Sequence, residues 1–323
     1  MGRHGSHKYG PTRHHRIDGR SLRSRSCWRR GSSGQDWCSS PSREFSFLHA
    51  MPACLPYRRA VGMKWVAYYP GNTHEGLVDS TGIVVLNDYE TGHPKAILDG
   101  MWITFARTAA CAAVFARYLT ARRNPQSLAL LGAGGLARWS LAMLSEEFTS
   151  LSEVRVTSRS RESRDSFCKE LAPLGAWNLR SCETAEEAVK DAEIVVSAIV
   201  PHATPPFRAE WLAPGSLLIA LDHLHAWDSR TFIEASRLIG DAEQFLVNAA
   251  PNYGLDWGSL GGYGDIGAIA AGAMAAREPD ESRLVGIPTG KASIDIALAA
   301  DLLTRNGASG RLAVDLGPRQ VGH

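Results

Sequence analysis

The sequence predicts an α/β protein in which a Rossmann dinucleotide-binding domain is inserted into a smaller α+β domain. Two observations predict this fold class. An apolar run at residues 128–144 is interrupted by glycines and then resumes with helical spacing, which is typical of a dinucleotide-binding turn. Before residue 100 the chain instead alternates apolar and polar residues, as half-buried β-strands do. At 323 residues the chain is long enough for both domains.

The N-terminal segment differs in charge from the rest of the chain. Residues 1–30 carry nine Lys or Arg residues and one acidic residue, whereas the remainder carries 26 basic and 32 acidic residues. A basic, acid-poor segment is compatible with nucleic-acid binding or with an organelle transit peptide. It has no amphipathic period, so we expect residues 1–40 to form a disordered basic tail. The net acidic remainder would repel phosphates, so we expect no nucleic-acid partner.

The next segment reads as a set of β-strands. From Val61 the sequence VGMKWVAYY alternates, which places Lys64 and Val66 on one face. Lysine usually lies on a solvated face, so the residues alone favour a solvent-facing Lys64, and the alternative is an ammonium group aimed into a cleft. Further strands are predicted at residues 83–86 and up to residue 99.

A helix is predicted from Ile103 to Leu119. Arg107 falls on an apolar stripe of this helix, together with Ile103, Ala110, Val114 and Tyr118. A buried arginine requires an anion. The anion is either an acidic residue such as Asp99, in a structural ion pair, or a substrate carboxylate that the planar guanidinium binds with two hydrogen bonds.

The Rossmann domain is predicted from the glycine turn onwards. In LALLGAGGLARWSLAML, Gly132 makes the tight turn, Gly134 lets the backbone approach a pyrophosphate, and the small Ala137 lets the helix pack on the strand. The alternative for this motif alone is an ordinary strand-to-helix corner. Further strands at residues 154–157 and 193–198, the second preceded by a helix at 184–191, favour the dinucleotide fold.

Composition sets further limits. No apolar run reaches the length of a membrane span, and 44% hydrophobic residues suffice for ordinary cores. The six cysteines show no paired spacing for a metal, so we expect no metal site and reduced, buried thiols in a cytoplasmic protein.

Six motifs in order make the chain similar to one known family. PSREFSFLHAMPA, GMKWVAYYPGN, TGHPKAILDG, ITFARTAA, LLGAGGLA and TGKASIDIALAADLL resemble the ornithine cyclodeaminase and mu-crystallin family over roughly residues 41–310. The resemblance implies a substrate and dimerisation domain (41–120 plus 295–323), an inserted NAD(P)-binding domain (121–294) and a homodimer. Family members use NAD or NADP to interconvert amino acids with imines or keto acids, or to cyclise ornithine.

The resemblance also implies roles for single residues. Arg43, Lys64 and Arg107 match the positions that hold the substrate carboxylate, which changes the interpretation of Lys64. Asp222 follows the strand SLLIALD and matches the proton donor or acceptor; without the family, Asp228 and His223 would compete for this role. The predicted cofactor site comprises Gly132, Gly134, Gly135, Leu136, Ser158, Arg159, Ser197, Ala198, Thr289 and Gly290, of which Thr289 and Gly290 are expected to close the cleft near the nicotinamide.

Departures from the family pattern bear on the substrate. Where the family commonly has a glutamine in the glycine turn, this sequence has Leu136. His49 stands where cyclodeaminases carry an acidic residue. The lysine that often follows the catalytic aspartate is absent, since the corresponding positions are Ala226 and Trp227. Together these favour an amino acid dehydrogenase or imine reductase over an ornithine cyclodeaminase. The second alternative is a non-catalytic protein of mu-crystallin type that binds small molecules and NADP.

The end of the second Rossmann strand predicts the cofactor. NAD-preferring folds usually carry an acid there, which binds the ribose hydroxyls and repels a 2′-phosphate. In VRVTSRSRES that position is Ser158, followed by Arg159 and Arg161, a combination that suits a 2′-phosphate. We therefore expect NADP rather than NAD, and the alternative is that these arginines lie in a solvated loop.

Overall fold

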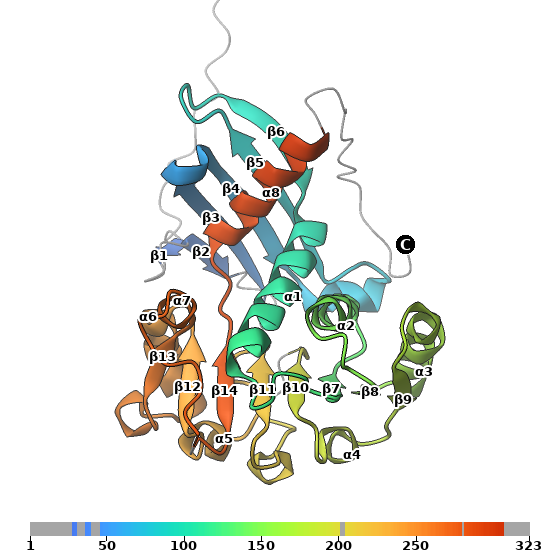
Figure 1. The fold of residues 1–323 in the computed structure, drawn as a ribbon. Coiled ribbons are helices and arrows are strands. Elements are labelled where there is room, and N and C mark those ends of the chain that lie inside the picture. Colours follow the sequence, from blue (N-terminus) through green and yellow to red (C-terminus); the bar gives the residue numbers. More distant parts are fainter. Residues whose placement is uncertain (1–27, 31–35, 40–45, 201–203, 280, 307–323) are drawn as a thin grey trace, which may run out of the picture.

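Two β-sheets, one antiparallel and one parallel, make up the structure (Figure 1). The computed structural model describes residues 28–30, 36–39, 46–200, 204–279 and 281–306. The parallel sheet lies between residues 127 and 287, so the sequence leaves the first sheet, builds the second and returns with its last helix. This arrangement confirms the predicted fold class of a Rossmann domain inserted in an α+β domain.

The antiparallel sheet has six strands in sequence order. They are β1 (Trp28–Arg30), β2 (Asp36–Ser39), β3 (Phe47–Leu55), β4 (Ala60–Tyr68), β5 (Ser80–Asn87) and β6 (Pro94–Asp99). β2 pairs along β3, so the two short strands extend the sheet inside the segment that the sequence predicted to be a disordered tail. The prediction treated the basic composition as uniform, although residues 28–30 and 36–39 carry tryptophans typical of strands. The other residues of 1–40 lie outside the described residues.

Helices α1 (Gly100–Leu119) and α8 (Ala292–Asn306) cover one face of this sheet (Figure 1). Asp99 begins α1, because its side chain accepts hydrogen bonds from the backbone N–H groups of Met101 and Trp102. The helix then runs from the antiparallel sheet to the parallel one, where it contacts β11 and β14. α1 is therefore the element that holds the two sheets together.

The parallel sheet has the strand order expected of a dinucleotide-binding fold. Its order is β13-β12-β14-β11-β10-β7-β8-β9, with β7 (Ser127–Leu131), β8 (Glu153–Thr157), β9 (Asn178–Ser181), β10 (Ile194–Ser197), β11 (Leu217–Ala220), β12 (Arg237–Gly240), β13 (Tyr263–Asp265) and β14 (Leu284–Ile287). The chain direction across the sheet reverses at β7, which lies between β8 and β10. Ligands of such sheets bind at this reversal, outside the carboxyl ends of the strands.

Six further helices flank the parallel sheet. They are α2 (Gly135–Glu147), α3 (Arg161–Leu171), α4 (Ala185–Val189), α5 (Ser229–Ile233), α6 (Glu243–Ala249) and α7 (Ile266–Ala270). Two apolar clusters pack on its two faces, and a third, smaller one lies between α1, α8 and the antiparallel sheet. Among the described residues, no helix combines the length and the apolar composition that a bilayer span requires.

Two details of the sequence prediction are wrong. Val114, placed on the buried stripe of α1, is 39% exposed, because α1 buries its small residues, such as Ala109 and Ala112, between two sheets. Cys54, expected to be a buried thiol, is exposed on β3.

Candidate active site

Three charged side chains from three elements meet between the antiparallel sheet and its covering helices. Lys64 of β4 places its Nζ 2.9 Å from Oδ2 of Asp295 on α8, and Arg107 of α1 donates from Nε to Oδ1 of the same carboxylate at 3.0 Å. Lys64 is 1% exposed and Asp295 is fully buried. The alternation of β4 turns Lys64 inward, which excludes the solvent-facing interpretation, and Arg107 pairs with Asp295 rather than with Asp99.

These three side chains carry two positive charges and one negative charge, and a second buried carboxylate, that of Asp241, lies nearby, hydrogen-bonded to the turn before α8. Burial, and then the neighbouring guanidinium of Arg107, lower the pKa of Lys64 to about 8, while Asp295 opposes this effect. The side chain of Lys64 therefore remains largely protonated at neutral pH. The Nη1 and Nη2 groups of Arg107 have no acidic partner among the described residues. A carboxylate from outside the chain could accept hydrogen bonds from these groups.

A tight turn before α8 packs against Arg107. Gly290 has a φ of +81°, and a Cβ at this position would lie 2.1 Å from Nη1 of Arg107. Asp241, which follows β12, holds the turn by accepting hydrogen bonds from the N–H and Oγ1 of Thr289 at 2.8 and 2.6 Å, and from the N–H of Gly290 at 3.3 Å. Only glycine fits there, and its absent side chain makes room for the guanidinium.

Asp222 lies just beyond the carboxyl end of β11 and is 5% exposed. Its Oδ1 accepts a hydrogen bond from the hydroxyl of Ser197 at 2.8 Å, and its Oδ2 accepts one from the backbone N–H of Ile199 at 3.3 Å. Burial raises the pKa of Asp222 to about 7, although these hydrogen bonds act in the opposite direction. A carboxyl group with this pKa can both donate and accept a proton near neutral pH.

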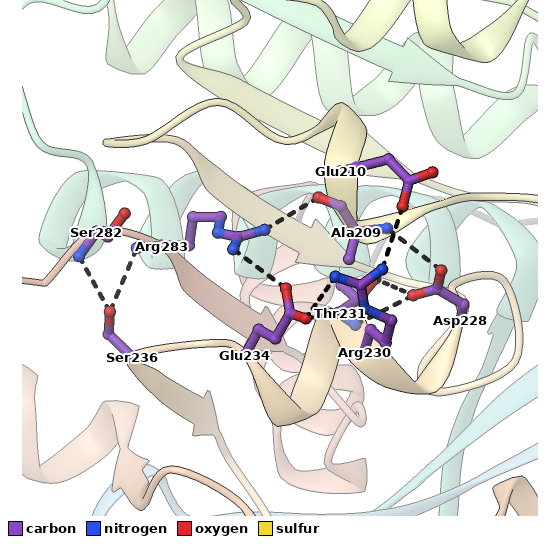
Figure 2. A network of polar contacts seen from close by, with 9 residues as sticks. All are labelled: Ala209, Glu210, Asp228, Arg230, Thr231, Glu234, Ser236, Ser282 and Arg283. Carbon is purple, nitrogen blue, oxygen red and sulfur yellow. Dashed lines mark hydrogen bonds and ion pairs between the residues drawn. The ribbon is translucent and has the colours of Figure 1, made fainter.

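The two rivals for the role of Asp222 have other surroundings. Asp228 begins α5: its carboxylate accepts hydrogen bonds from the N–H and hydroxyl of Thr231 and from the N–H of Ala209, inside the polar network that Figure 2 shows. It is a structural cap. Burial lowers the pKa of His223, with Asp241 opposing this effect and Arg107 adding to it. His223 is thus within electrostatic range of Arg107 and Asp241.

His49 adds a neutral group beside Lys64. It lies on β3, its Cα is paired with that of Val66, and its ring stacks on Phe47 with the ring centroids 4.3 Å apart. Burial, and then the positive charge of Lys64, lower the pKa of His49 to about 4. At neutral pH this imidazole carries no charge.

The glycine turn has the geometry that a pyrophosphate requires. Gly132 has a φ of +118°, and a Cβ there would lie 2.5 Å from the carbonyl oxygen of Ala198, so the ends of β7 and β10 approach closely. Around Gly134 there is open space, and no side chain caps the N-terminus of α2, which leaves its N–H groups for an anion. Gly135 and Leu136 form the first turn of this helix. These residues fit a dinucleotide.

The loop after β8 carries the residues predicted to select the cofactor. Arg159 is exposed, and no acidic residue occupies positions 158–160. The hydroxyl of Ser158 donates to the carbonyl oxygen of Ser160 at 2.8 Å, so it would have to rotate to bind a phosphate. Arg161 pairs with Asp165. Arg164 is buried and donates to the carbonyl oxygen of Ser158 at 3.2 Å, which fixes the loop.

The structure thus brings Lys64 and Arg107 together, and the hydroxyl of Ser197 donates a hydrogen bond to Asp222. Arg43 lies outside the described residues. The sequence analysis missed Asp295 and Asp241. Asp295 is an acid within an apolar helical run, and Asp241 directly follows a buried strand, so both patterns could have identified them.

Known proteins resemble this chain in sequence and in fold. Residues 36–225 match the model of the ornithine cyclodeaminase/mu-crystallin family. The chain is 30% identical to an alanine dehydrogenase of Archaeoglobus fulgidus over 262 residues, covering 78% of each chain. It is 26% identical to a Delta(1)-pyrroline-2-carboxylate reductase of Bacillus cereus, covering 79% of this chain and 80% of the reductase. An archaeal alanine dehydrogenase dimer with bound NAD superimposes with a TM-score of 0.71 at 28% identity, covering 82% and 83% of the two chains.

Proposed function

Because this chain belongs to the ornithine cyclodeaminase/mu-crystallin family, whose members include NAD(P)-dependent dehydrogenases and reductases of amino acids and imines, we propose that it interconverts an amino acid with its imine or 2-oxo acid. One observation carries the proposal: Lys64 and Arg107 meet in a buried cluster around Asp295, and a separate buried carboxyl group, that of Asp222 with a pKa of about 7, lies beyond the carboxyl end of β11.

The cation cluster binds and orients the substrate. The carboxylate of an amino or imino acid takes hydrogen bonds from Lys64 and Arg107, with Arg43 as the third expected contact. Fixing the carboxylate also fixes the α-carbon, and most of the gain in rate arises from this orientation. Asp295 holds both cations in place and keeps them charged.

Asp222 moves the proton. In the reductive direction the protonated carboxyl donates to the substrate nitrogen, or to the water that leaves it, and in the oxidative direction the carboxylate accepts that proton. A bound nicotinamide supplies or accepts the hydride. The first turn of α2, with Gly134 and Gly135, and the segment at Ala198 would hold its pyrophosphate.

His49 argues against ornithine as the substrate. A diamino acid carries a second ammonium group, which a neighbouring carboxylate would stabilise. An uncharged imidazole beside the Lys64 ammonium offers no such compensation. The site is thus better suited to an amino acid with an apolar or small side chain.

The first experiment tests the carboxylate site. In Lys64→Met, kcat/KM for pyruvate with ammonia or for Δ1-pyrroline-2-carboxylate should fall by at least 30-fold, since losing a desolvated charged contact costs about 2 to 5 kcal/mol. NADPH affinity should stay unchanged. Lys95→Met, which alters an exposed lysine on β6, serves as the control. Equal kinetics in the two variants would contradict the role of Lys64.

This assay also separates the alternatives. Turnover of ornithine without net consumption of NADPH would indicate a cyclodeaminase. Tight cofactor binding with no turnover of any imine or 2-oxo acid would indicate a mu-crystallin-type binding protein, and the raised pKa of Asp222 would then have no catalytic use.

We further propose that the cofactor is NADP(H). Arg159 can pair with a 2′-phosphate, and no acid in positions 158–160 would repel it. In fluorescence titrations NADPH should bind more tightly than NADH, and Arg159→Ala should weaken NADPH by about tenfold while leaving NADH unchanged. Arg161→Ala, which removes an arginine already paired with Asp165, is the matched control. Tighter binding of NADH would overturn this assignment.

The partner that we propose is a second copy of the chain. The face of the antiparallel sheet turned away from α1 and α8 exposes Trp65 and Ile97, which are 37% and 47% exposed, and carries the half-buried Met63, Ile83 and Val85 beside them. An apolar sheet face of this kind is typical of an interface. The related archaeal alanine dehydrogenase is a dimer.

A further inference from the structure

A chain of two buried hydrogen bonds ends on the carboxyl group of Asp222. The indole Nε1–H of Trp227 donates to Oγ of Ser197 at 3.0 Å, and the hydroxyl of Ser197 donates to Oδ1 of Asp222 at 2.8 Å. Trp227 is 1% exposed and Ser197 is fully buried, so water does not compete for these groups. The proposed mechanism does not use Trp227.

The chemistry of the three groups gives this chain a direction. An indole nitrogen can only donate, so the hydroxyl oxygen of Ser197 must act as the acceptor towards Trp227. The single hydrogen of that hydroxyl is then directed at Asp222, its other neighbour. If the indole were absent, Ser197 could also turn its oxygen to Asp222 and accept a hydrogen bond from the protonated carboxyl.

The backbone fixes the position of the indole. Trp227 lies on an isolated parallel bridge with Phe207, in which the N–H of Phe207 donates to Ala226 at 3.1 Å and the N–H of Asp228 donates to Phe207 at 3.0 Å. The rings of Phe207 and Trp227 pack with their centroids 5.2 Å apart. Packing against Phe207 therefore keeps the indole where it can donate its hydrogen bond to Ser197.

We propose that Trp227 is a positioning residue for Asp222: its indole N–H fixes the Ser197 hydroxyl as a donor to the carboxyl group and so favours the ionised form of Asp222. This inference rests on the proposed function only where it concerns turnover, because the hydrogen-bond chain exists with or without a substrate. Loss of the indole N–H should make Asp222 easier to protonate.

The other ionisable groups nearby can be separated from Asp222. No charged side chain is among the causes of its raised pKa, which are burial opposed by Ser197 and by backbone N–H groups. His223 follows it in sequence and feels Asp241 and Arg107. Next to Trp227, Asp228 is held at Ala209 and Thr231. A pH effect that runs through the proposed hydrogen bonds must disappear in Asp222→Asn. An effect of His223 would persist in that variant.

A spectroscopic test needs no substrate. The chain has nine tryptophans, and the indole N–H resonance missing from the 1H–15N spectrum of Trp227→Phe identifies that of Trp227. In the native protein this resonance should move with pH around a midpoint near 7, and the movement should vanish in Asp222→Asn and in Ser197→Ala. A resonance that does not move, or that moves equally in Asp222→Asn, would overturn the proposal.

A double-mutant cycle of Trp227 and Ser197 tests whether the indole changes the pH at which turnover is half-maximal. The pH midpoint of turnover should rise by roughly half a pH unit in Trp227→Phe and by about one unit in Ser197→Ala. In the Ser197→Ala background, Trp227→Phe should add no further change, because the intermediary is gone. A merely structural role predicts equal shifts in both backgrounds, or lower turnover with an unchanged midpoint.

The two proposals fail differently. If Asp222→Asn retains full activity, the proton-transfer role of Asp222 is wrong, but the resonance of Trp227 still reports whether the hydrogen-bond chain exists. If Asp222→Asn is inactive, but the Trp227 resonance of the native protein does not move with pH and Trp227→Phe leaves the pH midpoint of turnover unchanged, only the role of Trp227 is wrong.

Discussion

At the scale of single residues, the role proposed for Asp222 predicts how turnover depends on pH. Burial raises its pKa to about 7, so the acid form needed for imine reduction is lost as the pH rises through 7. Reductive kcat should therefore fall above pH 7, whereas oxidative kcat should rise over the same range. Stopped-flow measurements of cofactor absorbance between pH 5 and pH 9 check both directions. Parallel pH profiles in the two directions would contradict the assignment.

The same group makes a prediction for folding. Between its ordinary pKa near 4 and its value in the native protein near 7, Asp222 is protonated when folded and ionised when unfolded. The unfolded state then binds fewer protons, so this residue makes the free energy of unfolding decrease as the pH rises from 4 to 7. Asp222→Asn should flatten that part of the urea-unfolding profile, while Asp228→Asn, which alters a helix cap, should not.

Some of the site could be predicted from the sequence at this scale, and some could not. The two-residue period of a strand placed Lys64 and Val66 on the same face, but it could not decide which face is buried. That depends on α8, which supplies Asp295 from the far end of the sequence. No local pattern connects two residues that meet only when distant elements pack, so the role proposed for Lys64 comes from the family resemblance.

At the scale of elements, the turn between β14 and α8 positions Arg107. Gly290→Ala would place a methyl group where Nη1 of Arg107 now lies, as well as straining the backbone. We expect the KM for the imino acid to rise by at least tenfold, equivalent to about 1.4 kcal/mol, while NADPH affinity stays the same.

Gly254→Ala is the matched control for this variant. Gly254 has a φ of +68°, close to that of Gly290, but a Cβ there would meet no atom within 4 Å. It therefore reproduces the backbone strain without the contact to Arg107. If both variants lose the same thermal stability and show the same KM, the contact with Arg107 has no functional weight.

Helix α1 shows where the helical period of apolar residues does not predict the buried face. The glycine turn and the strands after it were predicted, because each depends on residues close in sequence. The buried stripe of α1 was misplaced, since a helix that contacts two sheets buries more than one face and Val114 falls outside both. A single apolar stripe is expected only for a helix with one partner surface.

At the scale of the whole molecule, the open face of the antiparallel sheet predicts the oligomeric state. Native protein should have twice the 35.0 kDa mass of one chain in light scattering. The double variant Trp65→Lys and Ile97→Lys should have the mass of a monomer, because it buries two charges at the interface. Leu174→Lys, at an exposed apolar residue outside this sheet, should remain a dimer. A native monomer would contradict the proposed partner.

The bridge between Arg107 and Asp295 also has a consequence for biosynthesis. The two residues are 188 positions apart, and the whole parallel sheet is translated between them. While the chain is still on the ribosome, Lys64 of the first sheet and Arg107 of α1 are two cations that belong in a dry interior and do not yet have Asp295 beside them. The interior cannot form around these two cations until α8, which carries Asp295, has left the exit tunnel. Release of the chain before Asp295 is made would therefore leave Lys64 and Arg107 without the carboxylate that joins them, even where the parallel sheet has folded.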